Sequence, residues 1–141
     1  MIWALVAGVG VGALAAVLWL RRAWLVVTVV GSSMQPTLRP GDRVLVRRAP
    51  RRIRVGQIVV HAMEPQLVIK RVAAVPGDPV PTGLAIPPGD RVPRGRLVLL
   101  GDNPDHSLDS RALGYYDRAD LVGVVVRPLS ASTGAAQRRA R

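Results

Sequence analysis

Residues 23–38 read AWLVVTVVGSSMQPTL. Seven of the first eight residues are apolar and the run is rich in β-branched side chains, which favours a strand over residues 23–30. Gly31 ends this strand, because glycine adopts the backbone angles that a sharp turn requires. The turn places Ser32 and Ser33 where the strand passes into a loop, and backbone N–H groups in such a turn are free to bind an oxyanion. The stretch predicts a β fold that presents a serine hydroxyl at the end of its first strand.

Further short apolar runs follow, and each is bounded by turns that contain Gly or Pro. They predict strands over residues 43–47, 57–62, 67–75, 97–100 and 121–126. No helical period appears after residue 22. Short strands at this spacing are typical of an all-β domain, so we expect a mainly β fold, a compact antiparallel β-barrel or sandwich.

The first 20 residues carry no charged side chain. A helix of this length spans about 30 Å, the thickness of the hydrocarbon core of a bilayer. Arg21 and Arg22 follow at once, with no small-residue cleavage site before them, so a retained anchor is favoured over a cleaved signal peptide. The predicted organisation is a transmembrane anchor over residues 1–20, a catalytic β-domain over 21–130 and a basic, disordered tail over 131–141.

Lysine is used only once in this chain. Of the 20 basic residues, Lys70 is the one lysine and the rest are arginines. A buried lysine can lose its proton and act as a base, whereas arginine cannot. Strand alternation puts Lys70 on the same face as Val68 and Val72, an apolar setting that would lower the pKa of its amine. A Ser–Lys hydrolase built on Ser33 and Lys70 is the resulting hypothesis. The alternatives are a solvated strand lysine and an ordinary polar turn at the serines.

The absence of cysteine excludes disulfides and thiolate catalysis. The net charge of +11 suits the proximity of anionic lipid or nucleic acid. Only three aromatic residues lie outside residues 1–20, which is too few for base-stacking surfaces, so no nucleic-acid partner is expected. Two histidines and scattered acidic residues show no ligand spacing, so no metal is expected either.

Four blocks of the sequence carry a family resemblance: GSSMQPTL at 31–38, GDRVLV at 41–46, IKRVAAVPGD at 69–78 and GDNPDHSLDSR at 101–111. In this order they resemble the type I signal peptidases of the Ser–Lys peptidase family, and the similarity covers about residues 23–126. The segment between residues 78 and 101 leaves no room for the second β-domain of larger relatives. The chain therefore resembles the minimal Gram-positive-type and mitochondrial-type members.

The resemblance implies a role for individual residues. Ser33 would be the nucleophile and Lys70 the general base. The oxyanion and supporting residues would be Gly31, Ser32, Asp102, Asn103, Ser107, Asp109 and Arg111. Among these, Ser107 would orient the lysine amine, and Asp109 and Arg111 would form an ion pair beside the site. The substrate groove would include Val30, Met34 and Val68.

The implied function is that of a membrane-anchored serine endopeptidase that cleaves signal peptides from exported pre-proteins after small residues. Substrates would bind as an extended strand, and no cofactor is implied. The enzyme would lie in the cell membrane as a single-pass protein with an extracytoplasmic catalytic domain. Arg21 and Arg22, which follow the anchor, point to the opposite orientation by the positive-inside rule.

The sequence leaves three other functions open. One is a maturation protease dedicated to a single partner protein. Another is an anchored, non-enzymatic basic module that binds anionic lipid or nucleic acid through the arginines of residues 47–54. The third is a Ser-His-Asp hydrolase that uses His61 or His106.

Overall fold

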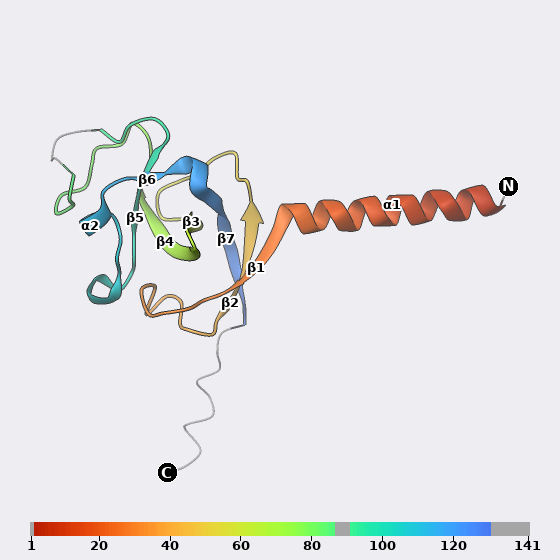
Figure 1. Ribbon diagram of the computed structural model, residues 1–141, viewed down its shortest axis with the longest axis horizontal. Helices are drawn as coiled ribbons and strands as arrows, with labels where there is room; N and C mark the ends of the chain where they lie inside the picture. The colour runs from red at the N-terminus through yellow and green to blue at the C-terminus, as the bar shows by residue number, and fades with distance from the viewer. Residues whose placement is uncertain (1, 87–90, 131–141) are drawn as a thin grey trace, which may run out of the picture.

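The computed structural model describes residues 2–86 and 91–130 of the chain. Helix α1 (Ile2–Ala23) leads directly into strand β1 (Trp24–Thr28). Figure 1 shows α1 projecting away from the β-domain, which it meets at its C-terminal end. Its described apolar side chains are accordingly exposed, and Val11 and Trp19 retain 69% and 67% of their accessible surface. Within the described residues, no helix has the length and apolar character needed to cross a membrane.

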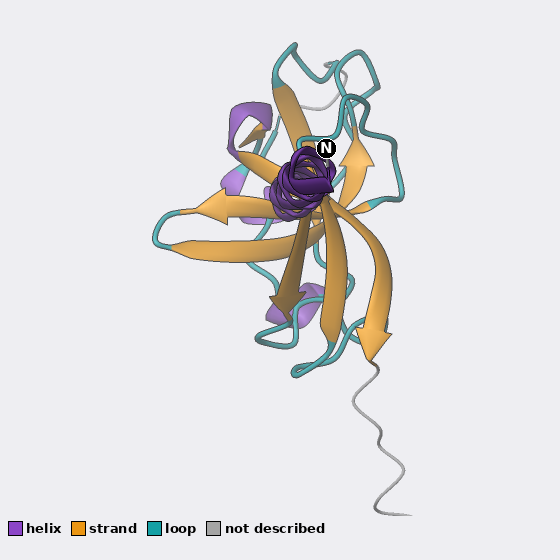
Figure 2. Ribbon diagram, turned by 90° about the vertical axis from the view of Figure 1, so that its right-hand side faces the viewer, coloured by secondary structure: helices purple, strands orange, loops and turns teal. Residues whose placement is uncertain are grey.

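The β-domain is one antiparallel sheet of seven strands in the order β1-β2-β7-β3-β4-β5-β6. The remaining strands are β2 (Arg43–Arg48), β3 (Ile58–Met63), β4 (Gln66–Ala74), β5 (Arg96–Leu100), β6 (Tyr116–Asp117) and β7 (Leu121–Ser130). One-turn helix α2 (Ser110–Leu113) and the 3-10 turns η1 (Pro104–His106) and η2 (Arg118–Asp120) lie between β5 and β7. Figure 2, which looks along α1, shows the strands curving around the domain behind the helix.

Buried side chains of this domain form three clusters, one of them around Ala74 and Val98. One cluster joins Met34 and Leu38 of the loop after β1 to Val44, Val60 and other residues. The second cluster gathers residues of β3, β4, β5 and β7, with Tyr116 at its edge. Burial of these β-branched and leucine side chains is what holds the sheet in its curved form.

The mainly antiparallel β prediction is confirmed. The first five predicted strands agree with the observed ones to within two residues at each end, and the last continues to Ser130. The closed-barrel alternative is wrong, because β1 and β6 are the two ends of the described sheet and do not pair. The prediction of no helix after residue 22 is wrong in detail, since α1 runs to Ala23 and the short helix α2 follows β5. Asp109 is the N-cap of α2, and its carboxylate accepts the N–H of Arg111. The predicted tail lies outside the described residues.

The register of β4 leaves half of one strand edge open. β4 pairs with β3 from Gln66 to Arg71, but it pairs with β5 only from Arg71 onward. The edge from Gln66 to Lys70 therefore has no partner strand on the β5 side among the described strands. β1 is likewise an edge strand, paired with β2 alone. Two strand edges with unpaired backbone groups are thus available to an added strand.

Candidate active site

A groove of about 490 Å³ lies between the end of β1 and the open half of β4. Residues 27–30 form one wall and residues 66–70 form the other, with Ser33 and Met34 between them. Ser33 and Lys70, 37 positions apart in sequence, thus share one cavity. The predicted groove residues Val30, Met34 and Val68 line the same cavity. Met34 is fully buried in the core below, whereas Val30 is 89% exposed at the rim.

Lys70 is buried in this groove, with only 4% of its surface exposed. Its Nζ donates a hydrogen bond of 2.9 Å to Oγ of Ser107. Burial lowers the pKa of the Lys70 amine below its ordinary value, and the positive charge of Arg111 adds to this effect. The negative charge of Asp109 opposes the change without cancelling it. The net effect is that the Lys70 amine loses its proton more readily than an exposed lysine does.

Asp109 organises the groups behind Lys70. This carboxylate is completely buried, and its Oδ2 accepts hydrogen bonds from Ser107 Oγ at 2.6 Å, from the Gly101 N–H at 2.7 Å and from Arg111 at 2.8 Å. Burial alone would raise the pKa of Asp109, but these donors and the Arg111 charge outweigh it, and the net pKa is lowered. Because the Ser107 hydroxyl donates its hydrogen bond to Asp109, its lone pairs are left to accept an N–H from Lys70.

Two polar residues after β5 hold the Ser33 loop close to the hydrogen-bond network of Lys70. The backbone N–H of Asn103 donates to the carbonyl of Ser33 at 2.9 Å, and its side chain donates to the carbonyl of Ser32 at 3.1 Å. Asp102 accepts from Thr37 at 2.6 Å and pairs with Arg71, the residue after Lys70, at 2.6 Å. Asp102 therefore ties the serine loop to the lysine strand.

Ser33 itself is left unbonded at both of its donor groups. Among the described residues, neither its hydroxyl nor its backbone N–H has a hydrogen-bond partner, and no bond joins Ser33 to Lys70. A long or absent contact of this kind is common before substrate binds. Gly31, two residues before Ser33, has a φ of 80°, in the left-handed region that favours glycine. This conformation turns the chain out of β1.

The structure also shows contributors that sequence reasoning missed. Gly101 is buried, and a Cβ placed there would lie 2.7 Å from the Ser33 carbonyl and 2.5 Å from Cβ of Ser107. Thr37 and Arg71 join the network through Asp102. The signal for Gly101 was present, since a glycine directly after an apolar strand often marks a close approach of backbone.

The histidine alternative has no geometric support. His61 lines a different cavity from Ser33, and its Nε2 lies 2.7 Å from the carbonyl of Asp117. His106 is exposed in η1. Within the part of the chain that is described, no three His, Asp or Glu side chains gather closely enough to hold a metal ion.

Replacing Asp109 with asparagine tests this network as a stability element. An amide has no charge to pair with Arg111, and its NH2 cannot accept the N–H that the second carboxylate oxygen accepts, so we expect the free energy of unfolding at pH 7 to fall by about 2–4 kcal/mol. The native chain should itself lose stability in acid, because a lowered carboxyl pKa contributes stability above pH 3.8 that disappears as the pH falls through the folded-state pKa. Urea denaturation of the full chain in detergent at several pH values measures both effects. Asp105→Asn, at an exposed carboxylate, is the matched control, and equal loss in both variants would contradict the role of Asp109.

Comparison with known proteins gives the class of this chain. A family described as "Signal peptidase, peptidase S26" matches residues 2–85 and 82–129. Signal peptidase IB of Staphylococcus aureus (strain COL) is 30% identical over an alignment of 140 residues. The match covers 70% of this chain and 73% of that protein. The chain is therefore an enzyme of the peptidase class. More closely, it belongs to the signal peptidase family, peptidase S26, as the sequence blocks predicted.

Proposed function

We propose that this chain is a serine endopeptidase that removes signal peptides with Ser33 as nucleophile and Lys70 as general base. One observation carries the proposal: the only lysine is buried in the same groove as Ser33, and it is held by the Ser107 hydroxyl, which itself donates a hydrogen bond to Asp109. A neutral amine has two N–H groups and one lone pair. With one N–H directed to Ser107, the lone pair is available to a substrate-ordered Ser33 hydroxyl.

The proposed reaction has two halves. Lys70 takes the Ser33 proton as Oγ attacks the substrate carbonyl, and the resulting ammonium gives that proton to the leaving amine. The acyl-enzyme is then hydrolysed by a water that Lys70 deprotonates, and the proton returns to Ser33. The unbonded N–H of Ser33 is one donor to the oxyanion. We assign the second donor to the Gly31–Ser32 turn, since position 31 has no hydroxyl.

Substrate binding follows from the two open strand edges. An extended peptide in the groove can pair with the edge of β1 and with residues 66–70 of β4, which supplies affinity through backbone bonds. The side-chain subsites beside Ser33 are walled by β-branched residues and by the buried Met34. Such walls favour small side chains next to the scissile bond, in keeping with cleavage after small residues.

We propose that α1 associates with the cell membrane as a single-pass anchor and that the domain faces away from the cytoplasm. The support is that the first 20 residues carry no charge and that the described apolar side chains of α1 are exposed. Alkaline extraction of membranes should leave the chain in the bilayer. Protease added to sealed cells should degrade the domain, and protection there would reverse the orientation.

The activity is tested with purified full-length chain in detergent and an exported pre-protein that carries a small-residue cleavage site. We expect one cut after the small residue, identified by sequencing the new N-terminus. No cut in any of several pre-proteins would contradict the proposal. Proteome analysis of cells that lack the chain separates the general enzyme from a dedicated one, since many uncleaved precursors indicate the first and a single precursor the second.

A further inference from the structure

Exposed arginines gather where helix α1 meets the sheet. Residues 1–63 contain nine arginines and a single acidic residue, Asp42, which is buried. Strands β1, β2 and β7 are neighbours in the sheet, and none of the three carries a carboxylate. The proposed peptidase chemistry does not use these arginines, so their concentration at one place needs another explanation.

Strand pairing brings two pairs of arginines together. Arg21 and Arg22 lie in the last turn of α1, and Trp24 follows as the first residue of β1. Trp24 pairs with Arg47 of β2, and paired Cα atoms in an antiparallel ladder lie about 5 Å apart. Arg47 and Arg48 therefore lie beside the end of the helix. Figure 1 agrees, since the end of β2 and the loop after it are on the side of the domain from which α1 leaves.

The loop after β2 adds two further exposed arginines, Arg51 and Arg52, in a fixed position. The N–H of Ala49 donates to the carbonyl of Val122 at 3.3 Å, at the start of this loop. The guanidinium of Arg118 donates to the carbonyl of Arg51 at 3.0 Å, in its middle. Because the backbone is already held, less conformational freedom is lost when the arginine side chains bind a partner.

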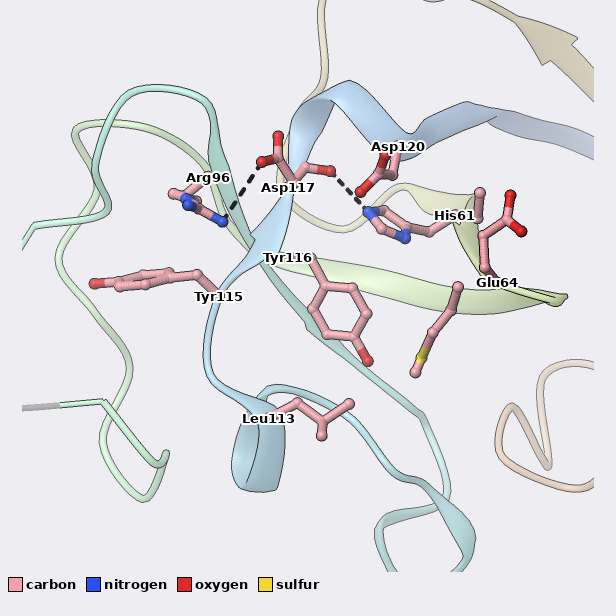
Figure 3. A pocket seen from close by; sticks show the side chains of 10 residues that line it. His61, Glu64, Arg96, Leu113, Tyr115, Tyr116, Asp117 and Asp120 are labelled. Atoms are coloured by element: carbon pink, nitrogen blue, oxygen red, sulfur yellow. Dashed lines mark hydrogen bonds and ion pairs between the residues drawn. The ribbon is translucent and has the colours of Figure 1, made fainter.

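None of these six arginines forms an ion pair within residues 2–86 and 91–130. The η2 turn adjoins the loop, but the carboxylates of Asp117 and Asp120 line the hollow around His61 (Figure 3). Asp117 is paired there with Arg96, at 3.6 Å. The arginines thus form a surface of one charge, which attracts anions. We call it the junction cluster and define it by Arg21, Arg22, Arg47, Arg48, Arg51 and Arg52.

The position of the junction cluster indicates which anion it meets. Trp19 and Leu20, in the last turns of α1, are 67% and 49% exposed, and the proposed function places α1 in the bilayer. The end of α1 is then at the level of the lipid headgroups. Figure 2 looks along α1, so the face of the domain around the helix end is the face turned toward the bilayer. Clusters of about four to eight basic residues beside a membrane helix favour anionic lipid.

We propose that the junction cluster binds the phosphate headgroups of anionic phospholipids and acts beside the peptidase site, not in place of it. The inference rests on the proposed association of α1 with the membrane. The chain enters the domain from α1 through β1, so lipid contacts on β2 and its loop give a second attachment that limits tilting. The groove begins at Val27, three residues or about 10 Å of strand after Trp24. Lipid binding therefore holds the groove at a constant height above the bilayer that also contains the signal peptide.

Native mass spectrometry of the full chain in detergent tests the binding. The chain is offered equal amounts of phosphatidylglycerol and phosphatidylcholine with the same acyl chains. We expect phosphatidylglycerol to be retained about tenfold more, because each arginine near a lipid surface contributes roughly a fivefold preference. The variant Arg47→Gln, Arg48→Gln should reduce the preference about fivefold or more. Arg39→Gln, Arg43→Gln removes two exposed charges at and before the other end of β2 and should keep it. A preference that is absent in the native chain, or unchanged in Arg47→Gln, Arg48→Gln, overturns the proposal.

A soluble polyanion tests the competing partner. The native chain is mixed with a DNA oligonucleotide at about 0.15 M salt, where the Debye length is about 8 Å. We expect the oligonucleotide to bind no more tightly to the native chain than to the Arg47→Gln, Arg48→Gln variant. DNA binding that this variant abolishes, without any preference for phosphatidylglycerol, would assign the arginines to nucleic acid and overturn the proposal.

Cleavage in vesicles separates the junction cluster from the peptidase assignment. We expect the native chain to cleave a membrane-inserted pre-protein about three- to tenfold faster in vesicles with phosphatidylglycerol than in pure phosphatidylcholine. The Arg47→Gln, Arg48→Gln variant should show no such difference, and both chains should cleave a short soluble peptide equally. Equal cleavage of the pre-protein by the native chain in both vesicles would overturn the positioning role alone. If no substrate is cleaved, the peptidase assignment fails, while the lipid preference measured by mass spectrometry still decides the junction cluster.

Discussion

Replacing Ser33 with alanine, or Lys70 with alanine, should reduce kcat/KM for a pre-protein by about a thousandfold or more. Without the Ser33 hydroxyl there is no nucleophile, and without the Lys70 amine nothing in the groove accepts its proton. Lys70→Arg should be as inactive as Lys70→Ala, because arginine keeps its proton. Single-turnover cleavage in detergent, followed by quantification of the mature product, measures all three variants.

Folding of these variants is the necessary control. Ser33 is partly buried and its hydroxyl has no hydrogen-bond partner among the described residues, so Ser33→Ala should unfold at the same urea concentration as the native chain. Lys70→Met, which keeps the buried stem and removes the amine, distinguishes a base from a packing element. Native-like activity in Ser33→Ala or in Lys70→Arg would remove the chemical basis of the proposed mechanism.

Gly101→Ala should be nearly as damaging to activity, although it touches neither proposed catalytic side chain. An added Cβ would overlap Oγ of Ser107 and lie 2.7 Å from the carbonyl of Ser33. The Ser107 hydroxyl holds the Lys70 amine, so both halves of the site must shift together. A displacement of about 1 Å can cost roughly a hundredfold in rate, and we expect at least that loss in kcat/KM.

Gly95→Ala is the matched comparison for Gly101→Ala. Gly95 has a φ of 76° and open space around its Cβ position, so alanine there strains the backbone without touching the site. It should lower stability and leave kcat/KM close to native. Equal activity in the two variants, measured with the same peptide, would mean that the position of Ser107 does not matter for cleavage.

Local patterns predicted most of the sheet because each strand is a short run of β-branched residues between Gly or Pro turns. They did not predict β6, since two residues such as Tyr116 and Asp117 form no pattern of their own. They also left a barrel as an alternative, because whether β1 and β6, the two end strands, pair to close the sheet depends on long-range contacts. Register, rather than composition, decides that the edge of β4 is unpaired from Gln66 to Lys70.

The candidate site was likewise predictable only in part. The rarity of lysine singles out Lys70, and the strand-to-turn transition singles out Ser33, each from the residues around it alone. Their meeting in one groove is a consequence of chain folding over 37 positions, which the residues around each could suggest only as a hypothesis and which the family resemblance supported.

Titration of the Lys70 amine tests the central proposal most directly. Because the chain contains one lysine, labelling with 15Nζ-lysine gives a single side-chain amine signal, which is followed by NMR against pH in the Ser33→Ala chain. We predict a midpoint clearly below 10.5, and kcat/KM of the native chain should rise with pH through the same region as the amine loses its proton. A midpoint at or above 10.5 would show an amine that stays charged in the groove and would contradict Lys70 as the base.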